Sequence, residues 1–392
     1  MDNQKEVLLR VENLCQYFGS VKAVDNVSFD IKKGEVFGLV GESGCGKTTT
    51  GRSIIKIYDI TSGSIYFKGQ RICAGLRAYR EELAEKRAEM KRNPEKAEQC
   101  KARIAELTAE IKQAKRDHKD CDKAYAAALV KECHEKYKPL LKNATGEALA
   151  DLKKQYANDL RVAKNSRLVT QIQMIFQDPI ASLNPRMTVK EIIAEGLVIN
   201  GITDQAYIDE KVYEILELVG LVREHAGRYP HEFSGGQRQR IGIARSVIMH
   251  PELLIADEPI SALDVSIQAQ VINLLNALRD TLDLTILFIA HDLSVVKYFS
   301  DRIGVMYFGK LVELASSDEL FAHPLHPYTR SLLSAIPLPD PHSEKKRIRI
   351  VYNAQTAHDY SVDKPTMREV SPGHFVYCND AEAQKYQKEL GL

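Results

Sequence analysis

The feature that most constrains this chain is the motif Gly41-Glu42-Ser43-Gly44-Cys45-Gly46-Lys47-Thr48, which has the spacing G-x4-G-K-[ST]. The apolar run Val36–Val40 before it predicts a buried strand, and residues 49–58 after it predict a helix. Such a loop lets backbone N–H groups turn inward around phosphate groups, and the helix N-terminus adds partial positive charge. The glycines that permit this turn are Gly41, Gly44 and Gly46. The motif therefore predicts a nucleotide-binding loop.

Three residues at the end of this motif carry its chemistry. Lys47 is expected to reach the β- and γ-phosphates of ATP, and the hydroxyl of Thr48 is expected to bind Mg²⁺. Thr49 begins the helix and is expected to lie at the same phosphates. ATP and Mg²⁺ are therefore the expected cofactors.

A second element is the apolar run that ends in two acids, Leu253-Leu254-Ile255-Ala256-Asp257-Glu258. A continuous apolar run is typical of a central parallel strand, with its carboxyl end at the ligand. Asp257 is expected to hold Mg²⁺ through water. Glu258, one residue further on, is expected to polarise the attacking water as a general base.

A third element, Ser234-Gly235-Gly236-Gln237, stands shortly before that strand and is followed by a helical pattern. Ser234 can cap the helix, and the two glycines permit a ligand to approach the backbone closely. The sequence is a common loop composition when it stands alone. Its position before residues 253–258 makes it specific.

Composition divides the 392-residue chain into four zones. Residues 1–73 and 166–322 alternate β-rich and helical stretches, which is the pattern of a parallel α/β core. Residues 74–165 carry 22 Lys/Arg and 16 Asp/Glu, a net charge of +6 in a chain whose total is +1. Residues 323–392 form a tail rich in Pro and His at its start and polar at its end. The small total charge gives no reason to expect a nucleic acid partner.

The charged segment is interpreted as an inserted coiled-coil hairpin of two or three antiparallel helices. Apolar residues recur at steps of three and four, and a helix over residues 94–138 would be about 65 Å long. A solvated insertion without chemistry is favoured over a docking arm for a partner. The seam consists of Ala97, Cys100, Ile104, Leu107, Ile111, Ala114, His118, Cys121, Tyr125 and Ala128.

The order of these motifs resembles an ABC nucleotide-binding domain over residues 7–73 and 166–322. The resemblance implies an α/β P-loop ATPase with a helical signature subdomain, in which residues 234–237 of one subunit bind the γ-phosphate of ATP held by another. It also implies roles for single residues. Gln177 would sense Mg²⁺ and the permease, Asp264 would lie at the dimer seam, and His291 would contact the γ-phosphate. Phe18, with Tyr17 as a close alternative, would stack on adenine.

A closer resemblance is to the oligopeptide/dipeptide importer branch. It rests on the segment from Phe176-Gln177-Asp178-Pro179 to Pro185-Arg186 and on the tail motif His323-Pro324-Leu325-His326-Pro327-Tyr328-Thr329-Arg330. Two features depart from the family: the 130 positions between Lys47 and Gln177, and Ile260 where the family usually has Thr. Some relatives hold an iron–sulfur cluster in the tail. Only Cys378 lies in this tail, so no cluster is expected.

The resemblance implies an ATPase subunit of a peptide importer, held as a peripheral protein at the cytoplasmic face of the cell membrane. Its implied partners are a sister ATP-binding subunit or a second copy of itself, two transmembrane permease subunits and an external solute-binding protein. An alternative is a soluble ABC ATPase of DNA maintenance or translation, in which the insertion is a docking arm. A non-hydrolytic interaction subunit conflicts with Glu258 and His291. The transported solute and the choice between homodimer and heterodimer stay open.

Overall fold

The computed structural model describes residues 6–261, 263–336, 349–361 and 363–391. The chain divides into two structural units. The first unit comprises Met1–Gly63, Ala256–Glu258 and Thr285–Leu392, and the second comprises Ser64–Ile255 and Pro259–Leu284.

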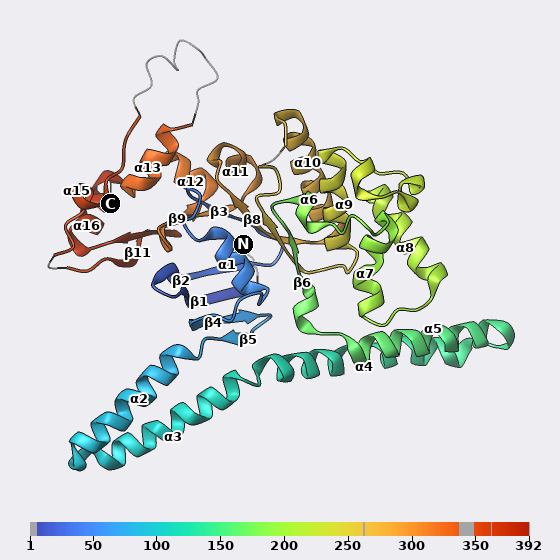
Figure 1. Ribbon diagram of the computed structural model, residues 1–392, viewed down its shortest axis with the longest axis horizontal. Coiled ribbons are helices and arrows are strands. Elements are labelled where there is room, and N and C mark those ends of the chain that lie inside the picture. Colours follow the sequence, from blue (N-terminus) through green and yellow to red (C-terminus); the bar gives the residue numbers. More distant parts are fainter. Residues whose placement is uncertain (1–5, 262, 337–348, 362, 392) are drawn as a thin grey trace, which may run out of the picture. The chain divides into compact units, whose positions relative to one another are not determined.

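Parallel strands form the centre of the first unit (Figure 1). β3 (Val36–Val40) pairs in parallel with β8 (Thr285–Ala290) on one side and with β9 (Arg302–Tyr307) on the other. All residues of β3 and β8 are buried, which explains why their sequences are almost continuously apolar. Val40 lies opposite Ala290, so the loops that follow the two strands leave the sheet at the same edge.

The sheet continues on the β9 side through antiparallel strands in the order β9-β10-β12-β11. These strands are β10 (Lys310–Ser316), β11 (Thr366–Ser371) and β12 (His374–Cys378). A small core formed by Leu325, Val370, Val376, Cys378 and Tyr386 packs on them. Two strands therefore come from the tail, which the sequence had only indicated to be polar at its end.

An antiparallel pair and several helices complete the first unit. The pair is β1 (Val7–Phe18) and β2 (Val21–Lys32). The helix α11 (Leu293–Phe299) packs closely on β3 at Gly38, where a Cβ atom would lie 2.4 Å from Cγ1 of Val296. The other helices are α1 (Lys47–Ile54), α12 (Ser317–Ala322), α13 (Pro327–Ser334), α15 (Ala354–Ala357) and α16 (Asp380–Glu389).

The second unit consists mainly of helices. Thr188 begins α7 with a capping box that it shares with Glu191, and Asp204 caps α8. Its helices outside the charged segment are α6 (Pro179–Ser182), α7 (Val189–Ile199), α8 (Gln205–Leu218), α9 (Gly235–Val247) and α10 (Val265–Leu282). Its strands are β5 (Gln70–Ala74), β6 (Ile172–Ile175) and most of β4 (Ser62–Phe67) and β7 (Leu253–Asp257).

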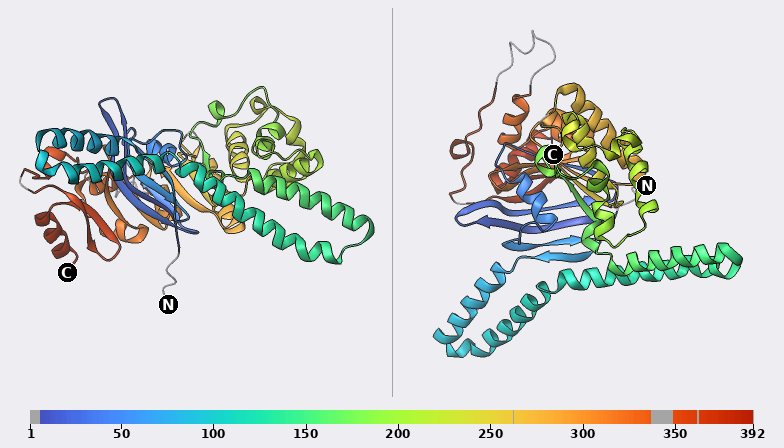
Figure 2. Two further views of the ribbon diagram at one scale, coloured as in Figure 1. Left: turned by 90° about the horizontal axis from the view of Figure 1, so that it is seen from below. Right: turned by 45° about the vertical axis from the view of Figure 1, so that its right-hand side comes forward.

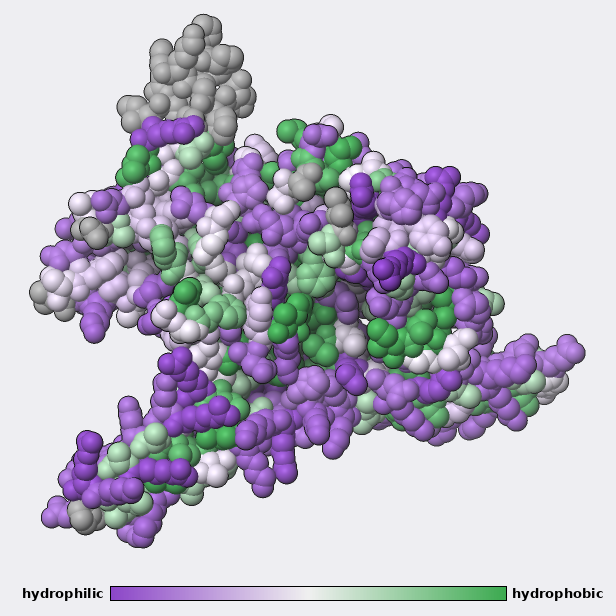
Figure 3. All heavy atoms as spheres, in the orientation of Figure 1, coloured by the Kyte–Doolittle hydropathy of each residue, from purple (hydrophilic) through white to green (hydrophobic). Residues whose placement is uncertain are grey.

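The charged segment of the second unit folds into four helices, which form two antiparallel pairs (Figures 1 and 2). The pairs are α2 (Arg77–Arg92) with α3 (Ala97–Ala114), and α4 (Asp117–Asn143) with α5 (Gly146–Asn165). Hydrophilic side chains cover most of the visible face of both pairs (Figure 3). Among the described residues, no helix is both long enough and apolar enough to cross a lipid bilayer.

The single helix expected over residues 94–138 is not formed, because the chain breaks between Ala114 and Asp117. The start of α4 is instead fixed to β5. Asp117 accepts a hydrogen bond from Nε of Arg71 at 2.7 Å, and Sγ of Cys121 donates to the carbonyl of Arg71 at 3.3 Å. Heptad spacing continues across the break, but these contacts redirect the chain there. Supercoiling of the helices in each pair remains a prediction.

Shortening the α4–α5 pair is expected to leave ATP binding within about twofold of wild type, because exposed hairpin tips tolerate such changes. Tyr137 and Tyr156 face each other with ring centroids 5.1 Å apart. Residues 138–155 can therefore be replaced by a short glycine-rich turn, and nucleotide affinity and the thermal unfolding midpoint measured. As a control, Asp117→Ala at the base should lower the unfolding midpoint, because it leaves Arg71 unpaired. Loss of ATP binding in the shortened protein would show that the α4–α5 pair is needed for the ATP-binding site.

Candidate active site

The loop of residues 41–48 lies between β3 and α1 in the first unit, and its shape depends on glycine. Gly41, Gly44 and Gly46 have φ angles of 148°, 81° and 107°. A Cβ atom at Gly41 would lie 2.2 Å from the carbonyl oxygen of Met306, and one at Gly46 would lie 2.2 Å from that of Ala23. Both positions therefore exclude any larger residue.

The N-terminus of α1 is arranged to receive an anion. The helix begins at Lys47 after Gly46, and no acidic residue lies in its first turn. Among the described residues, no side chain caps this helix. Its first N–H groups and the helix dipole therefore remain directed at a ligand. Thr49 lies in the same turn, and its carbonyl accepts a hydrogen bond from the hydroxyl of Ser53 at 2.7 Å.

Lys47 is 3% exposed and lies within the loop. Its Nζ donates hydrogen bonds to the carbonyl oxygens of Gly41 at 2.7 Å and of Glu42 at 2.9 Å. The ammonium group is thus held beside the position that the loop offers to phosphates. Phosphate oxygens would replace these carbonyl oxygens as its partners.

Thr48 and Asp257 meet across the ends of α1 and β7. The Thr48 hydroxyl donates to Oδ1 of Asp257 at 2.7 Å. Oδ2 of Asp257 is buried and has no hydrogen-bond partner among the described residues. Burial raises the pKa of Asp257. Hydroxyl and carboxylate oxygens are the ligands that Mg²⁺ prefers, so this pair suits that ion.

Glu258 and His291 lie together at the carboxyl ends of β7 and β8. The N–H of Glu258 donates to the carbonyl of Ile289 at 3.0 Å, and Oε2 lies 3.3 Å from Nδ1 of His291. Glu258 is 9% exposed and has a φ of 44°, a conformation rare for residues other than glycine. Backbone strain of this kind clusters at functional sites. The carboxylate is held where a general base can act.

The geometry distinguishes the two aromatic residues at the end of β1. The hydroxyl of Tyr17 donates to Oδ1 of Asp25 at 2.6 Å, and its ring is half-buried. The ring of Phe18 is 44% exposed and packs edge-on against Tyr58, with centroids 5.2 Å apart. Phe18 therefore offers the more accessible ring for a nucleotide base, and it is the better candidate.

The remaining predicted site residues belong to the second unit. Ser234 and Gln237 form a reciprocal capping box at the start of α9. The N–H of Gln237 donates to Oγ of Ser234 at 3.3 Å, and the N–H of Ser234 donates to Oε1 of Gln237 at 3.1 Å. Gly236 packs so closely against α10 that a Cβ atom at this position would lie 2.7 Å from Cγ2 of Ile267. Gly235 begins the helix. The N-terminus of α9 is therefore capped by a side chain, unlike that of α1.

Gln177 and Asp264 both lie at exposed positions beside secondary structure. Gln177 follows β6, and Arg245 holds the segment around it by stacking on Phe176 and donating to the carbonyl of Ser182 at 2.6 Å. Asp264 precedes α10, and its carbonyl accepts hydrogen bonds from the first turn. In the first unit, the structure brings together the loop, Asp257, Glu258 and His291.

One contact at this site was absent from the sequence prediction. The hydroxyl of Tyr328, in α13, accepts a hydrogen bond from the N–H of Glu42 at 3.1 Å. Tyr328 belongs to the tail motif, which was the signal that marked this stretch. That motif did not indicate where the side chain would lie.

A family model described as ABC transporter matches residues 24–145 and 137–261, and one described as Oligopeptide/dipeptide transporter, C-terminal region matches residues 312–361. The oligopeptide transport ATP-binding protein OppF of Bacillus subtilis is 47% identical over 97% of this chain and 99% of its own length. The dipeptide transport ATP-binding protein DppF of Lactococcus lactis is 44% identical over 95% and 93%.

Solved structures show the same fold at lower identity. MJ1267, an ATP-binding cassette of an ABC transporter, has a TM-score of 0.54 at 21% identity and covers 84% of this chain and 99% of that chain. The cbiO1 protein of Clostridium perfringens, part of the transporter complex cbiONQ, has a TM-score of 0.52 at 21% identity and covers 81% and 92%.

Proposed function

The chain belongs to the family of ABC transporter ATP-binding proteins, and from that premise we propose that it hydrolyses ATP to power the import of oligopeptides or dipeptides. The observation that carries this proposal is the near full-length similarity to peptide transport ATP-binding proteins, at 44–47% identity. The C-terminal region characteristic of such transporters is included in the similarity. The runner-up, a soluble ATPase of DNA maintenance or translation, has no comparable support.

The site geometry supports a division of roles in hydrolysis. Lys47 and the N-terminal N–H groups of α1 bind the phosphates, and Phe18 stacks on the base. Thr48 and Asp257 would hold Mg²⁺, which supplies charge neutralisation at the phosphates when bound. Glu258 takes a proton from the attacking water, and His291 beside it positions that carboxylate and meets the γ-phosphate. Gln177 would sense both the bound Mg²⁺ and the attached permease.

Assembly is proposed from the same family premise. Residues 234–237 and Asp264 would meet ATP held by a sister ATP-binding subunit or a second copy of this chain. Two permease subunits and an external solute-binding protein would complete the importer. The chain would then act as a peripheral subunit at the cytoplasmic face of the membrane, because the other subunits hold it there.

The test is peptide uptake by the assembled complex. The chain is co-expressed with permease and ATPase subunits of a peptide importer from the same organism, and the complex is reconstituted in vesicles with its binding protein. We expect a labelled tetrapeptide or dipeptide to accumulate only with ATP, and a complex carrying Glu258→Gln to serve as the inactive control. Uptake of a nickel complex or glutathione in place of any peptide would overturn the assignment of solute class. Failure to co-purify with permeases would overturn the importer itself.

A further inference from the structure

Tyr328 joins the C-terminal region of the first unit to the phosphate-binding loop. Its side chain is 2% exposed, and its hydroxyl accepts a hydrogen bond from the N–H of Glu42 at 3.1 Å. Glu42 directly follows Gly41, the residue at which β3 turns into the loop. The acceptor for this backbone group therefore comes from a residue 286 positions away.

The Glu42 residue is held through both of its backbone groups. Tyr328 binds its N–H, and Nζ of Lys47 donates to its carbonyl at 2.9 Å. On binding phosphate, Lys47 would give up that carbonyl. The hydrogen bond to Tyr328 does not involve the phosphate-binding groups, so it can persist in both states. It then keeps the entry of the loop in place while Lys47 changes partners.

The ring of Tyr328 is fixed by its neighbours. It packs against Tyr307 and Tyr352, with centroids 4.4 and 5.6 Å away. Its own N–H donates to Nδ1 of His326 at 3.1 Å, which caps α13. Burial, with the charges of His358 and Arg330, lowers the pKa of His326 to about 3, so the ring stays neutral and Nδ1 can accept.

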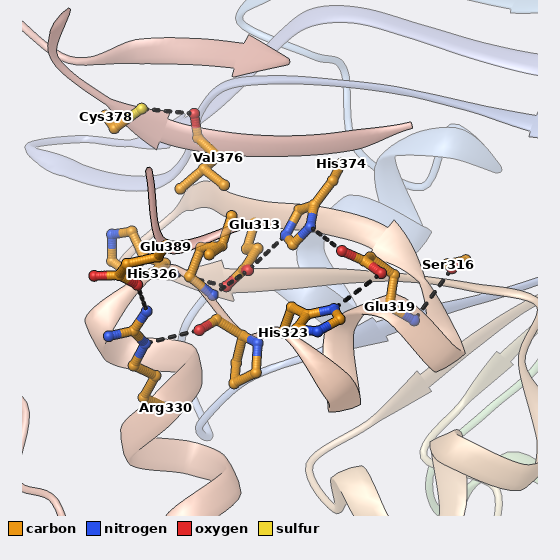
Figure 4. Close-up of polar contacts among 12 residues, drawn as sticks. Glu313, Ser316, Glu319, His323, His326, Arg330, His374, Val376, Cys378 and Glu389 are labelled. Carbon is orange, nitrogen blue, oxygen red and sulfur yellow. Dashed lines mark hydrogen bonds and ion pairs between the residues drawn. The ribbon is translucent and has the colours of Figure 1, made fainter. Parts of the chain in front are cut away.

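The start of α13 is in turn anchored to β10 and, through it, to β12 (Figure 4). Glu313, in β10, accepts hydrogen bonds from the N–H groups of Leu325 at 2.8 Å and His326 at 3.1 Å. Nε2 of His374, in β12, lies 2.8 Å from the same carboxylate, and both side chains are fully buried. A continuous set of buried contacts thus runs from β12 to the loop.

We propose that Tyr328 is a positioning residue for ATP binding: its hydroxyl, held by the C-terminal region, fixes the Glu42 N–H and thereby preorganises the phosphate-binding loop. The proposal rests on the ATP-binding function proposed above. Preorganisation lowers the entropy that the loop loses when it closes on a ligand. The C-terminal region would then contribute to nucleotide affinity without touching the nucleotide.

The test compares Tyr328→Phe with Tyr352→Phe in the full chain. Both changes remove one hydroxyl from the same aromatic cluster, but that of Tyr352 lies 3.0 Å from Nε2 of His358 and not at the loop. Loss of one neutral hydrogen bond corresponds to about a three- to tenfold change in an equilibrium constant. We expect Tyr328→Phe to weaken Mg-ATP binding and raise KM by that factor with kcat nearly unchanged. Tyr352→Phe should leave the affinity unaltered.

Two measurements separate positioning from a loss of fold. Isothermal titration gives a dissociation constant for the folded molecules even if the folded fraction falls, because that fraction appears in the stoichiometry. Amide hydrogen exchange in peptides covering residues 41–46 should become faster in Tyr328→Phe only. Unchanged ATP affinity in Tyr328→Phe, or equal weakening in both variants, would overturn the proposal. Failure of the wild-type chain to bind ATP would instead overturn the proposed function.

Discussion

Replacing Glu258 with glutamine is expected to leave ATP binding intact and to reduce hydrolysis at least about 100-fold, the lower end of general-base contributions. Glutamine keeps the shape of a side chain that is 9% exposed and whose Oε2 lies 3.3 Å from His291. It removes the proposed proton acceptor and also a negative charge beside the expected position of the γ-phosphate. Binding of ATP should therefore hold or tighten while the chemical step stops.

The same variant should accumulate as an ATP-dependent dimer, because residues 234–237 are proposed to bind the γ-phosphate of ATP held by the other subunit, and that phosphate persists when hydrolysis stops. Phosphate release and sedimentation, each with and without Mg²⁺, measure the two effects. They should be repeated on the assembled transporter in case the natural partner is a different chain. Glu224→Gln, an exposed change of the same kind, is the matched control. Turnover at the wild-type rate in Glu258→Gln would mean that another group is the catalytic base.

The arrangement around the loop follows from rules that act over short distances in sequence. An apolar run followed by a glycine-rich turn and a helix predicts β3, the loop and α1, and the structure contains them. The carboxyl end of a central parallel strand lies at the ligand, so Asp257 and Glu258 were expected near Lys47. His291 was expected there only from the family resemblance. Their precise roles remain predictions, and so does the part assigned to Gln177.

Contacts distant in sequence account for what was missed. Heptad spacing predicted a helix that continued past Ala114. The spacing of apolar residues contains no information about the contact between Arg71 and Asp117, which are 2.7 Å apart and lie far from each other in sequence. The strand β12 was not predicted, because the burial of His374 depends on Glu313 and Glu319, which precede the tail, and that of Cys378 depends on a core formed with other segments. Tyr328 illustrates the same difficulty, since its position depends on α13 docking beside the loop.

Replacing Lys47 with alanine is expected to abolish measurable ATP binding. Hydrogen bonds to charged groups contribute about 1.5–3 kcal/mol each, so losing even one costs roughly 10- to 100-fold in affinity. Lys47 is 3% exposed. Arginine has the same charge, but it would place a larger, planar group in this buried position and therefore does not replace lysine there. The alanine variant also loses the hydrogen bonds from Nζ to the carbonyls of Gly41 and Glu42, so the empty loop should become more mobile.

That second effect requires a control, because a loosened loop and an unfolded protein both fail to bind ATP. Equilibrium titration with a fluorescent ATP analogue should therefore be paired with thermal unfolding in the absence of nucleotide. A midpoint close to wild type, together with lost binding, assigns the effect to the missing ammonium group. Lys388→Ala, in the exposed last turn of α16, should change neither measurement. Affinity within about twofold of wild type in Lys47→Ala would show that residues 41–48 do not bind the phosphates, since a hydrogen bond from a buried ammonium group to phosphate should contribute more than that.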